Sequence, residues 1–313
     1  LIDEAAARGI RVFIDIHSDA FSRFVMKGCG NGFPEWAVTV GPTVTPDNGP
    51  NCKGWGDMQL FDQQVHANYL AFYEGKTPVR GRYMKMLERL TQEYKTRPSV
   101  LGFDLINEPY GDWNDKLLPL YTEAEKVIRA VDKSKILFLE PSLGRVALFG
   151  VTTSAPLKRP SFGNFVFAPH YYDMQILIAG RMFVDQTEGE IARLAKIGAD
   201  WKAPVIVGEF SAPFSPYNLT EPEKAASSME YVEKLYKAFN NNLLSATQWT
   251  YVPSWNPKDL DGWNAENVSI VDDKGNLRNF RPRPTAERIA GTPKKMQEVL
   301  PKDAVTHSFT LEW

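Results

Sequence analysis

Residues 100–109 read VLGFDLINEP. The first part of this stretch is apolar except for Gly102 and Asp104, and such a run is typical of a strand buried on both faces of a parallel sheet. Asn107, Glu108 and Pro109 then follow at its carboxyl end. A carboxylate in that place is costly to desolvate unless it is paired or has a function. The stretch predicts a parallel sheet with a functional site at one edge.

The same pattern returns at residues 204–210, which read PVIVGEF and place Glu209 at the end of a second apolar run. Cleavage of a glycosidic bond requires two such carboxylates, one as acid and one on the opposite side of the sugar. We therefore assign Glu108 as the general acid/base and Glu209 as the nucleophile. The alternative is that both are strand-end carboxylates in structural ion pairs.

Strand and helix patterns alternate along the chain. The strand patterns cover residues 11–17, 100–107, 135–141, 164–170, 204–210 and 243–251. Apolar stripes at helical spacing separate them, at residues 83–94, 117–131 and 225–239. This alternation predicts βαβ units, in either an open doubly wound sheet or a barrel.

The strand ends favour the barrel. No glycine-rich phosphate loop follows any strand pattern, whereas polar or aromatic side chains end nearly all of them. These are Asp15 with His17, Asn107 with Glu108, Glu140, His170 with Tyr172, Glu209, and Gln248 with Trp249. We expect an α/β protein with a (β/α)8 TIM barrel that lacks its first two strands in this chain.

Two segments depart from this pattern. Residues 18–78 form a long connection rich in glycine, proline and aromatic side chains, which is typical of a lid or a binding wall. Residues 281–284, RPRP, indicate a stiff linker, and Phe309, Leu311 and Trp313 alternate like a strand after it. We predict a catalytic barrel domain over residues 1–280 and the start of a second domain over residues 281–313.

The composition excludes several classes of protein. The 36 lysines and arginines are balanced by 38 acidic residues, for a net charge of −2, so no nucleic-acid partner is expected. No apolar run approaches the roughly 18 residues of a membrane span. The four histidines lack ligand spacing, so no metal centre is expected, and we set aside a metal site at the pair His17 and Asp19.

Cys29 and Cys52 both lie in the long connection. A disulfide between them would pin this segment and would place the protein in an oxidising compartment, secreted or extracytoplasmic. Two unrelated buried thiols are the alternative.

Further polar side chains are candidates for binding a sugar. Asn107 is placed to contact the sugar 2-hydroxyl, although asparagine also caps turns. His170 and Tyr172 share one face of an extended segment, from which Tyr172 is expected to donate to Glu209 and keep it ionised. A satisfied core histidine is the alternative for His170.

His17 and Asp19 show the same spacing and are candidates for binding sugar hydroxyls. Trp249 ends the last strand pattern and offers a flat platform for a pyranose ring, with Trp255 and Trp263 in the loop after it. Core packing is the alternative for any one of these tryptophans. Residues 176–179, ILIA, with Met182 and Phe183 indicate either an apolar wall for a lipid or a helix face turned to the core.

Taken together, these motifs resemble glycoside hydrolase family five. The matching segments are residues 14–17 (IDIH), 105–109 (LINEP), 168–172 (APHYY), 207–210 (VGEF) and 248–251 (QWTY). Within that family the chain resembles the endoglycoceramidase group and its sterylglucosidase relatives. The segments that carry this finer likeness are residues 17–24 (HSDAFSRF), 32–36 (GFPEW), 261–264 (DGWN) and the tail over residues 281–292.

The resemblance implies retaining hydrolysis of the β-glycosidic bond between a sugar headgroup and a lipid such as ceramide, by double displacement and without a cofactor. It makes His17, Asp19, Asn107, Tyr172 and Trp249 sugar-binding residues, and it implies a glycolipid or oligosaccharide substrate. Transient contact with a membrane or micelle surface follows, and no obligate protein partner is expected. The tail would lead into a C-terminal β-sandwich domain, of which residues 281–313 hold the linker and the first strand.

The sugar headgroup and two alternative functions are left open. Ser18 stands where the group usually has glutamine, which bears on the sugar headgroup. A β-1,4-endoglucanase or mannanase acting on a polysaccharide belongs to the same family. A non-catalytic carbohydrate- or lipid-binding relative is the alternative from another class.

Overall fold

The structure is a computed structural model that describes residues 1–25, 27–47, 52, 55–143, 156–179, 182–214, 219–286, 289–299 and 308–313. These residues fall into two compact units. The first holds the described residues up to Ala168 and the second holds those from Pro169 onward. In the described part of the chain, no helix has the length and apolar character needed to cross a membrane.

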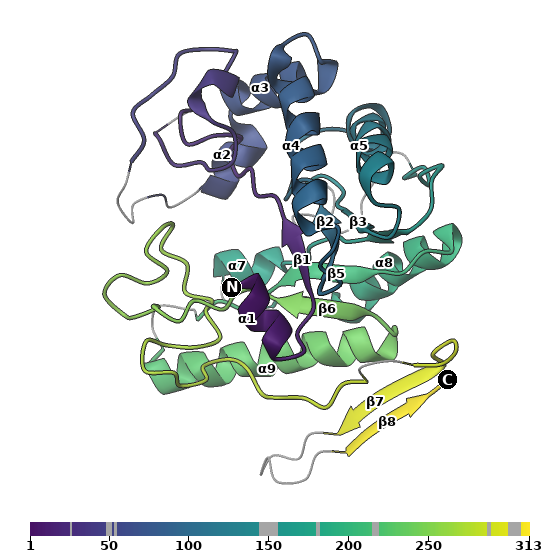
Figure 1. Cartoon of the computed structure of the whole chain (residues 1–313). Helices are drawn as coiled ribbons and strands as arrows, with labels where there is room; N and C mark the ends of the chain where they lie inside the picture. Colours follow the sequence, from purple (N-terminus) through teal and green to yellow (C-terminus); the bar gives the residue numbers. More distant parts are fainter. Residues whose placement is uncertain are drawn as a thin grey trace. The chain divides into compact units, whose positions relative to one another are not determined.

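The first unit contains a parallel sheet of β1 (Val12–Asp15), β2 (Val100–Asp104), β3 (Ile136–Leu139) and β4 (Phe165–Phe167), in that order. Figure 1 labels the first three of these strands. Asp15 pairs with Asp104, so the carboxyl ends of β1 and β2 lie level. Gly102 allows β2 and β3 to approach closely, because a Cβ there would overlap the carbonyl oxygen of Ile136. The four strands predicted in this part of the chain are confirmed, each a few residues shorter than expected.

One expectation about these strands was wrong. β2, β3 and β4 are largely buried, but every residue of β1 is only partly buried. β1 lies at the edge of the described sheet, so one of its sides has no neighbouring strand there. Its apolar sequence therefore does not correspond to burial on both faces in this unit.

Helices of the first unit bury the predicted stripes. α4 (Pro78–Tyr94) begins with proline in its first turn and buries Tyr83 and Leu87, and α5 (Leu118–Val131) buries Leu120, Tyr121, Ala124 and Ile128. The Tyr83 hydroxyl donates a hydrogen bond to the carbonyl of Leu105, just after β2. α4 therefore fixes the segment that leads to Asn107 and Glu108. The described part of this unit also contains α1 (Ile2–Ala7) and the π-helical turn η2 (Trp113–Leu117).

The long connection over residues 18–78 contains helices that were not predicted from the sequence. It contains η1 (Glu35–Ala37), α2 (Trp55–Phe61) and α3 (Gln63–Glu74). α3 buries Val65, Tyr69, Phe72 and Tyr73, a helical spacing that the flanking glycines and prolines obscured. We call residues 18–78 the excursion.

Aromatic packing and a disulfide give the excursion its own core. Phe21 stacks on Phe33 with ring centroids 4.3 Å apart, and Phe33 packs on Phe72 at 5.0 Å. Cys29 and Cys52 are joined by a disulfide, with their Cα atoms 5.0 Å apart. Of the two alternatives for these cysteines, the structure therefore has the bridge.

The second unit contains β5 (Ile206–Phe210) and β6 (Ser245–Gln248), which pair in parallel. α8 (Thr187–Trp201) precedes β5, and α9 (Glu221–Asn241) connects the two strands after a capping box of Thr220 and Glu223. α8 was not predicted. α9 contains the third predicted stripe, and both strands are confirmed.

The end of the chain forms a hairpin. β7 (Lys295–Val299) and β8 (Ser308–Glu312) are antiparallel, and β7 packs on α9 (Figure 1). The strand expected around residues 309–313 is confirmed as β8, whereas β7 was missed because it has only two apolar residues among charged and polar ones. The division into a barrel over residues 1–280 and a second domain over residues 281–313 stays a prediction.

Candidate active site

Glu108 is held in an unusual backbone conformation in the first unit. Its side chain is nearly buried, with 4% of the residue exposed, and its φ is +40°. A left-handed conformation outside glycine costs about 1–3 kcal/mol, and a following proline disfavours helical conformations further. Its N–H donates to Glu140 Oε2 at 3.0 Å, and its carbonyl accepts from Gln59 Nε2 at 2.7 Å. The turn that presents Glu108 is therefore fixed on both sides of the residue.

Asn107 and Asp19 are brought together beside this turn. Asn107 Nδ2 donates to Asp19 Oδ1 at 2.9 Å, and Asn31 Nδ2 donates to Asp19 Oδ2 at 2.5 Å. The Asn107 backbone N–H donates to the carbonyl of Ile16 at 2.9 Å, which ties it to the end of β1. Asp19 is buried, so within this unit its carboxylate orients Asn107. Sugar binding by Asn107 and Asp19 stays a prediction.

His17 lies between two carboxylates. Its Nε2 is 2.9 Å from Asp15 Oδ2, and its Nδ1 is 3.3 Å from Asp19 Oδ2. Burial lowers the pKa of His17, but the hydrogen bonds and charges of Asp15 and Asp19 outweigh burial and raise the pKa to about 12. Both ring nitrogens then carry protons and act as donors. Carboxylates engage both ring nitrogens of His17, and we assign no metal at His17 and Asp19.

A carboxylate cluster lies at the same ends of the strands. Asp15, Asp104 and Glu140 place oxygen atoms within 4.8 Å of one another, which is a spacing that a cation could bridge. Asp15 also contacts His17, and Glu140 accepts from the Glu108 backbone. The carboxylates of this cluster thus have protein partners, and we assign no metal here.

Glu209 is the centre of the predicted residues in the second unit. It lies on β5 and is 8% exposed. The Tyr172 hydroxyl donates to Glu209 Oε2 at 2.9 Å, as expected from the sequence, and His170 Nδ1 lies 3.5 Å from the same oxygen. The Tyr171 N–H donates to the Glu209 carbonyl at 2.8 Å, which holds the extended segment beside β5. The spacing of His170 and Tyr172 thus directs both side chains to one carboxylate.

Trp249 follows β6 and is half-buried. Its N–H donates to the Phe210 carbonyl at 3.0 Å, next to Glu209 in the chain, and its indole Nε1 donates to Glu266 Oε2 at 2.8 Å. Asn264 donates to the other oxygen of Glu266 at 2.8 Å. The indole ring is therefore fixed in orientation close to β5.

The tryptophan platform is smaller than expected. Trp255 is buried, with the Arg278 guanidinium over its ring at 3.3 Å from the centroid, so it is not available for a sugar. Trp263 is half-buried. Of the two alternatives for Trp255, the structure therefore has core packing, because the loop after β6 turns this side chain into its own core.

The apolar run near residue 176 has both buried and exposed side chains, so it matches in part each of its two alternatives, a helix face turned to the core and an apolar wall for a lipid. In α7 (Met174–Ala179), Ile176 is buried but Leu177 is exposed, and Phe183 is 64% exposed. Gln175 accepts from the N–H groups of Phe183 and Val184 at 2.9 and 3.0 Å, which ties this exposed edge to α7. The side chains of Ile178 and Ala179 lie outside the described residues.

Two residues of the site escaped sequence reasoning. Glu140 was recognised only as a polar residue at a strand end, and Gln59 was not recognised at all. Glu140 follows β3 directly, so its position carried a signal. Gln59 lies in α2 within the excursion, and its contact with Glu108 across 49 positions had no signal in the sequence.

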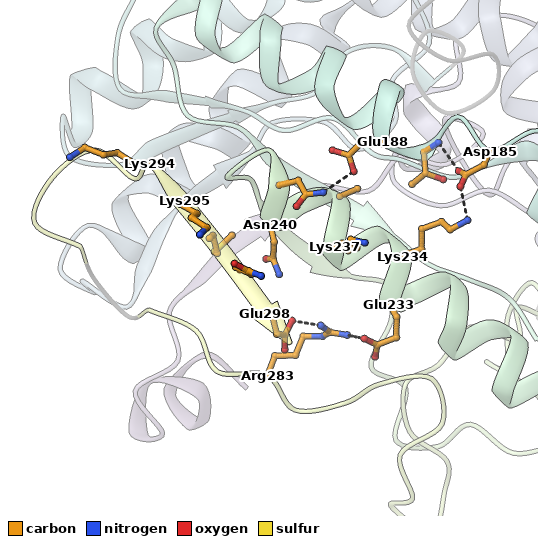
Figure 2. A pocket seen from close by; sticks show the side chains of 15 residues that line it. Asp185, Glu188, Glu233, Lys234, Lys237, Asn240, Arg283, Lys294, Lys295 and Glu298 are labelled. Atoms are coloured by element: carbon orange, nitrogen blue, oxygen red, sulfur yellow. Dashed lines mark hydrogen bonds and ion pairs between the residues drawn. The ribbon is translucent and has the colours of Figure 1, made fainter. Parts of the chain in front are cut away.

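A separate pocket of about 940 Å³ lies between α8, α9 and β7 (Figure 2). Five of its charged side chains pair with one another: Lys234 pairs with Asp185 at 2.6 Å, and Arg283 pairs with Glu233 at 2.6 Å and with Glu298. None of the predicted site residues lines it. We therefore do not assign this pocket as the active site.

Comparison with known proteins identifies the family. The sequence pattern described as cellulase, glycosyl hydrolase family 5, matches residues 1–255. The chain belongs to this family. The match spans all five of the segments that carried the resemblance, from residues 14–17 to residues 248–251, so the family predicted from the sequence is confirmed.

The individual relatives are endoglycoceramidases, which is the group expected from the sequence. An endoglycoceramidase from Cyanea nozakii is 30% identical over 172 residues, which cover 45% of this chain and 33% of the relative. Two further endoglycoceramidases are covered over 39% and 36% of their length. The chain thus spans little more than a third of the length of the curated relatives it matches.

Solved structures agree on the fold. Endo-glycoceramidase II from Rhodococcus sp., in a cellobiose-like imidazole complex, gives a TM-score of 0.71 at 20% identity, over 97% of this chain and 70% of that one. The same enzyme has been solved as a ganglioside GM3 complex. Sterylglucosidase 1 from Cryptococcus neoformans gives 0.63 at 14% identity, over 87% of this chain and 64% of that one. These likenesses confirm the predicted α/β fold class of the TIM-barrel type.

Proposed function

We propose that this chain is the catalytic part of a retaining β-glycosidase that releases a sugar headgroup from a lipid. The observation that carries the proposal is the setting of Glu209. This nearly buried carboxylate receives the Tyr172 hydroxyl at 2.9 Å. A donor to a carboxylate oxygen favours the ionised form, and the ionised form is the nucleophile. Membership of a glycosyl hydrolase family supports the same role.

The proposed reaction has two displacements. Glu209 attacks the anomeric carbon while Glu108 donates a proton to the leaving oxygen, so the bond to the lipid breaks and a glycosyl ester forms on Glu209. Glu108, now ionised, takes a proton from water, and the resulting hydroxide attacks the anomeric carbon. The ester bond to Glu209 then breaks, the sugar leaves with its β-configuration retained, and both carboxyl groups return to their first state. This scheme needs no cofactor.

Other residues orient the sugar in this proposal. Asn107 contacts the 2-hydroxyl, in an orientation set by Asp19 at 2.9 Å. His17 lies beside the sugar, where its two N–H groups hold the carboxylates of Asp15 and Asp19, and Trp249 offers its indole face to a pyranose ring. The fixed orientation of both rings, through Asp15 for His17 and Glu266 for Trp249, supports these roles.

The lipid part of the substrate is inferred from two observations. Relatives are endoglycoceramidases, and one has been solved with a ganglioside. Leu177 and Phe183 are exposed apolar side chains in the unit that carries Glu209. A polysaccharide hydrolase would need a longer row of exposed tryptophans, and the burial of Trp255 weakens that alternative. Transient contact with a membrane or micelle would follow from a lipid substrate.

The disulfide supports a proposal about location. Cys29 and Cys52 are buried and bonded to each other in the excursion. Such bonds persist in oxidising compartments and are rare in the cytosol. We propose that the protein is secreted or extracytoplasmic.

Mass spectrometry of the products tests the substrate class. The chain is incubated with a glycosphingolipid carrying several sugars, with a steryl glucoside and with a cello-oligosaccharide. Release of an intact oligosaccharide and ceramide is expected. Preferred cleavage of the cello-oligosaccharide would favour the polysaccharide hydrolase, and no cleavage of any substrate would favour a binding protein. Glu209→Ala should cleave none of them while still binding a fluorogenic β-glucoside.

A further inference from the structure

We propose that Gln59 and Glu140 are positioning residues that hold Glu108 in the geometry of a proton donor. The proposal rests on the proposed role of Glu108 as general acid/base. Gln59 and Glu140 come from different parts of the first unit, α2 in the excursion and the end of β3, and both are 1% exposed. They bind the two backbone polar groups of Glu108.

The conformation of Glu108 explains why such support is needed. Its φ of +40° is unfavourable for a residue with a Cβ, and Pro109 adds a steric restriction. A residue of this kind keeps its conformation only where its surroundings hold it. Glu140 accepts from the N–H of Glu108, and Gln59 donates to its carbonyl, so the turn is held from both ends.

Gln59 connects this turn to a second one. Its Oε1 accepts from the Ala20 N–H at 2.8 Å, and its Nε2 donates to the Glu108 carbonyl at 2.7 Å and to the Tyr69 hydroxyl at 3.1 Å. Ala20 also has a positive φ, 51°, and directly follows Asp19. One buried amide thus joins the turn that carries Asp19 to the turn that carries Glu108.

Glu140 is itself fixed in place. Its own carbonyl accepts from the Tyr121 hydroxyl of α5 at 2.7 Å, and its Oε2 accepts from the Glu108 N–H at 3.0 Å. A general acid must lie within hydrogen-bond reach of the leaving oxygen, and a displacement of about 1 Å can cost about 100-fold in rate. Loss of either anchor should therefore impair proton donation by Glu108 specifically.

The test uses two aryl β-glycosides that differ in their need for an acid. A 2,4-dinitrophenolate leaves without protonation, whereas a phenolate of high pKa requires it. We expect Gln59→Leu to lower kcat/KM about 10- to 100-fold for the phenyl glycoside and less than about 3-fold for the dinitrophenyl glycoside. Glu140→Ala should show the same selectivity, and Glu140→Gln, which keeps an acceptor for the Glu108 N–H, should restore most of the rate.

Asn68→Leu is the matched control. Asn68 is an equally buried amide in the excursion, but its contacts are to the backbone at Thr39, Val40 and Gln64. The Asn68→Leu variant should lower the rates with both substrates by one common factor, because less of the protein is folded. An equal loss with both substrates in Gln59→Leu and Glu140→Ala would overturn the proposal.

A second measurement does not depend on turnover. Amide hydrogen exchange at Glu108, followed by NMR with ¹⁵N-labelled glutamate, should accelerate at least about 10-fold in Glu140→Ala and remain near the wild-type rate in Asn68→Leu, because only the first variant removes the acceptor. Unchanged exchange in Glu140→Ala would refute the anchoring. A wild-type chain that hydrolyses neither glycoside but shows the exchange effect would instead refute the proposed function.

Discussion

The Tyr172 hydroxyl donates to Glu209 Oε2 at 2.9 Å, and both residues belong to the second unit. His170 Nδ1 approaches the same oxygen at 3.5 Å. A single oxygen of this carboxylate is thus held by two side chains from one extended segment. This arrangement constrains the rotation of the Glu209 side chain.

Tyr172→Phe should reduce turnover with little change in stability. The substitution removes the donor to Glu209 but keeps the ring, so we expect kcat to fall about 100- to 1,000-fold, as for loss of one preorganised donor. Steady-state kinetics with an aryl β-glycoside checks this. Tyr236→Phe is the control, because the Tyr236 hydroxyl donates to Gln248 Oε1 at 3.3 Å instead of to Glu209. Similar kcat values for Tyr172→Phe and the wild type would contradict the role of the donor.

His17 should stay protonated well above neutral pH. Its pKa is raised from 6.5 to about 12 by Asp15 and Asp19 despite burial. NMR of ¹⁵N-labelled histidine at pH 8 should therefore show two protonated ring nitrogens. A neutral ring at that pH would contradict the arrangement.

The same shift predicts how stability depends on pH. A pKa raised on folding stabilises the protein fully below the unfolded value of 6.5, and the contribution is lost as pH rises toward the folded value of about 12. The difference in Tm between the wild type and His17→Gln should therefore be largest near pH 6 and should narrow steadily toward pH 9. A difference in Tm that grows with pH would contradict this prediction.

Removal of the disulfide should destabilise the excursion. The bond joins residues 23 positions apart, and closing a loop of this size contributes about 3 kcal/mol. The double substitution Cys29→Ser and Cys52→Ser should lower the free energy of unfolding by about that amount in urea titrations. Wild-type protein kept under reductant should match the double variant. Equal stability of the oxidised and reduced forms would show that the bridge contributes nothing.

Arg283 should be the main electrostatic contact between α9 and the hairpin. It pairs with Glu233 at 2.6 Å and with Glu298 (Figure 2). It also stacks over the Tyr236 ring at 4.0 Å. Arg283→Ala leaves two poorly solvated carboxylates without their cation, which should cost about 2–4 kcal/mol. Lys196→Ala is the control, since its pair with Asp200 is exposed and should be worth less than about 1 kcal/mol. Equal losses in the free energy of unfolding for Arg283→Ala and Lys196→Ala, measured by urea titration, would contradict this prediction.

Much of the fold could be predicted because its signals are local. The run before Glu108 is apolar except for Gly102 and Asp104, the run before Glu209 is apolar, and each leads to a carboxylate that we assign to the site. The helices of the excursion were missed because their apolar residues stand between glycine- and proline-rich segments. β7 was missed because its strand has only Met296 and Val299 as apolar residues.

The residues of the candidate site also divide into those predicted from a local pattern and those that were missed. The spacing of His170 and Tyr172 was enough to predict the contact of Tyr172 with Glu209, because both lie on one extended segment. The contact of Gln59 with Glu108 depends on how the excursion folds back, and no local pattern encodes it. For Trp255 the sequence left a sugar platform and core packing open, and the structure, in which Arg278 covers its ring, has core packing.

The most direct test of the central claim is to trap the glycosyl ester on Glu209. A 2-deoxy-2-fluoro-β-glycoside with a dinitrophenolate leaving group forms the ester readily and hydrolyses it slowly, because the fluorine destabilises the oxocarbenium-like transition states. Digestion and mass spectrometry should place the added sugar on Glu209 in the wild type, with no label in Glu209→Ala. A label on another carboxylate, or turnover of the unfluorinated glycoside by Glu209→Ala at the wild-type rate, would contradict the assignment.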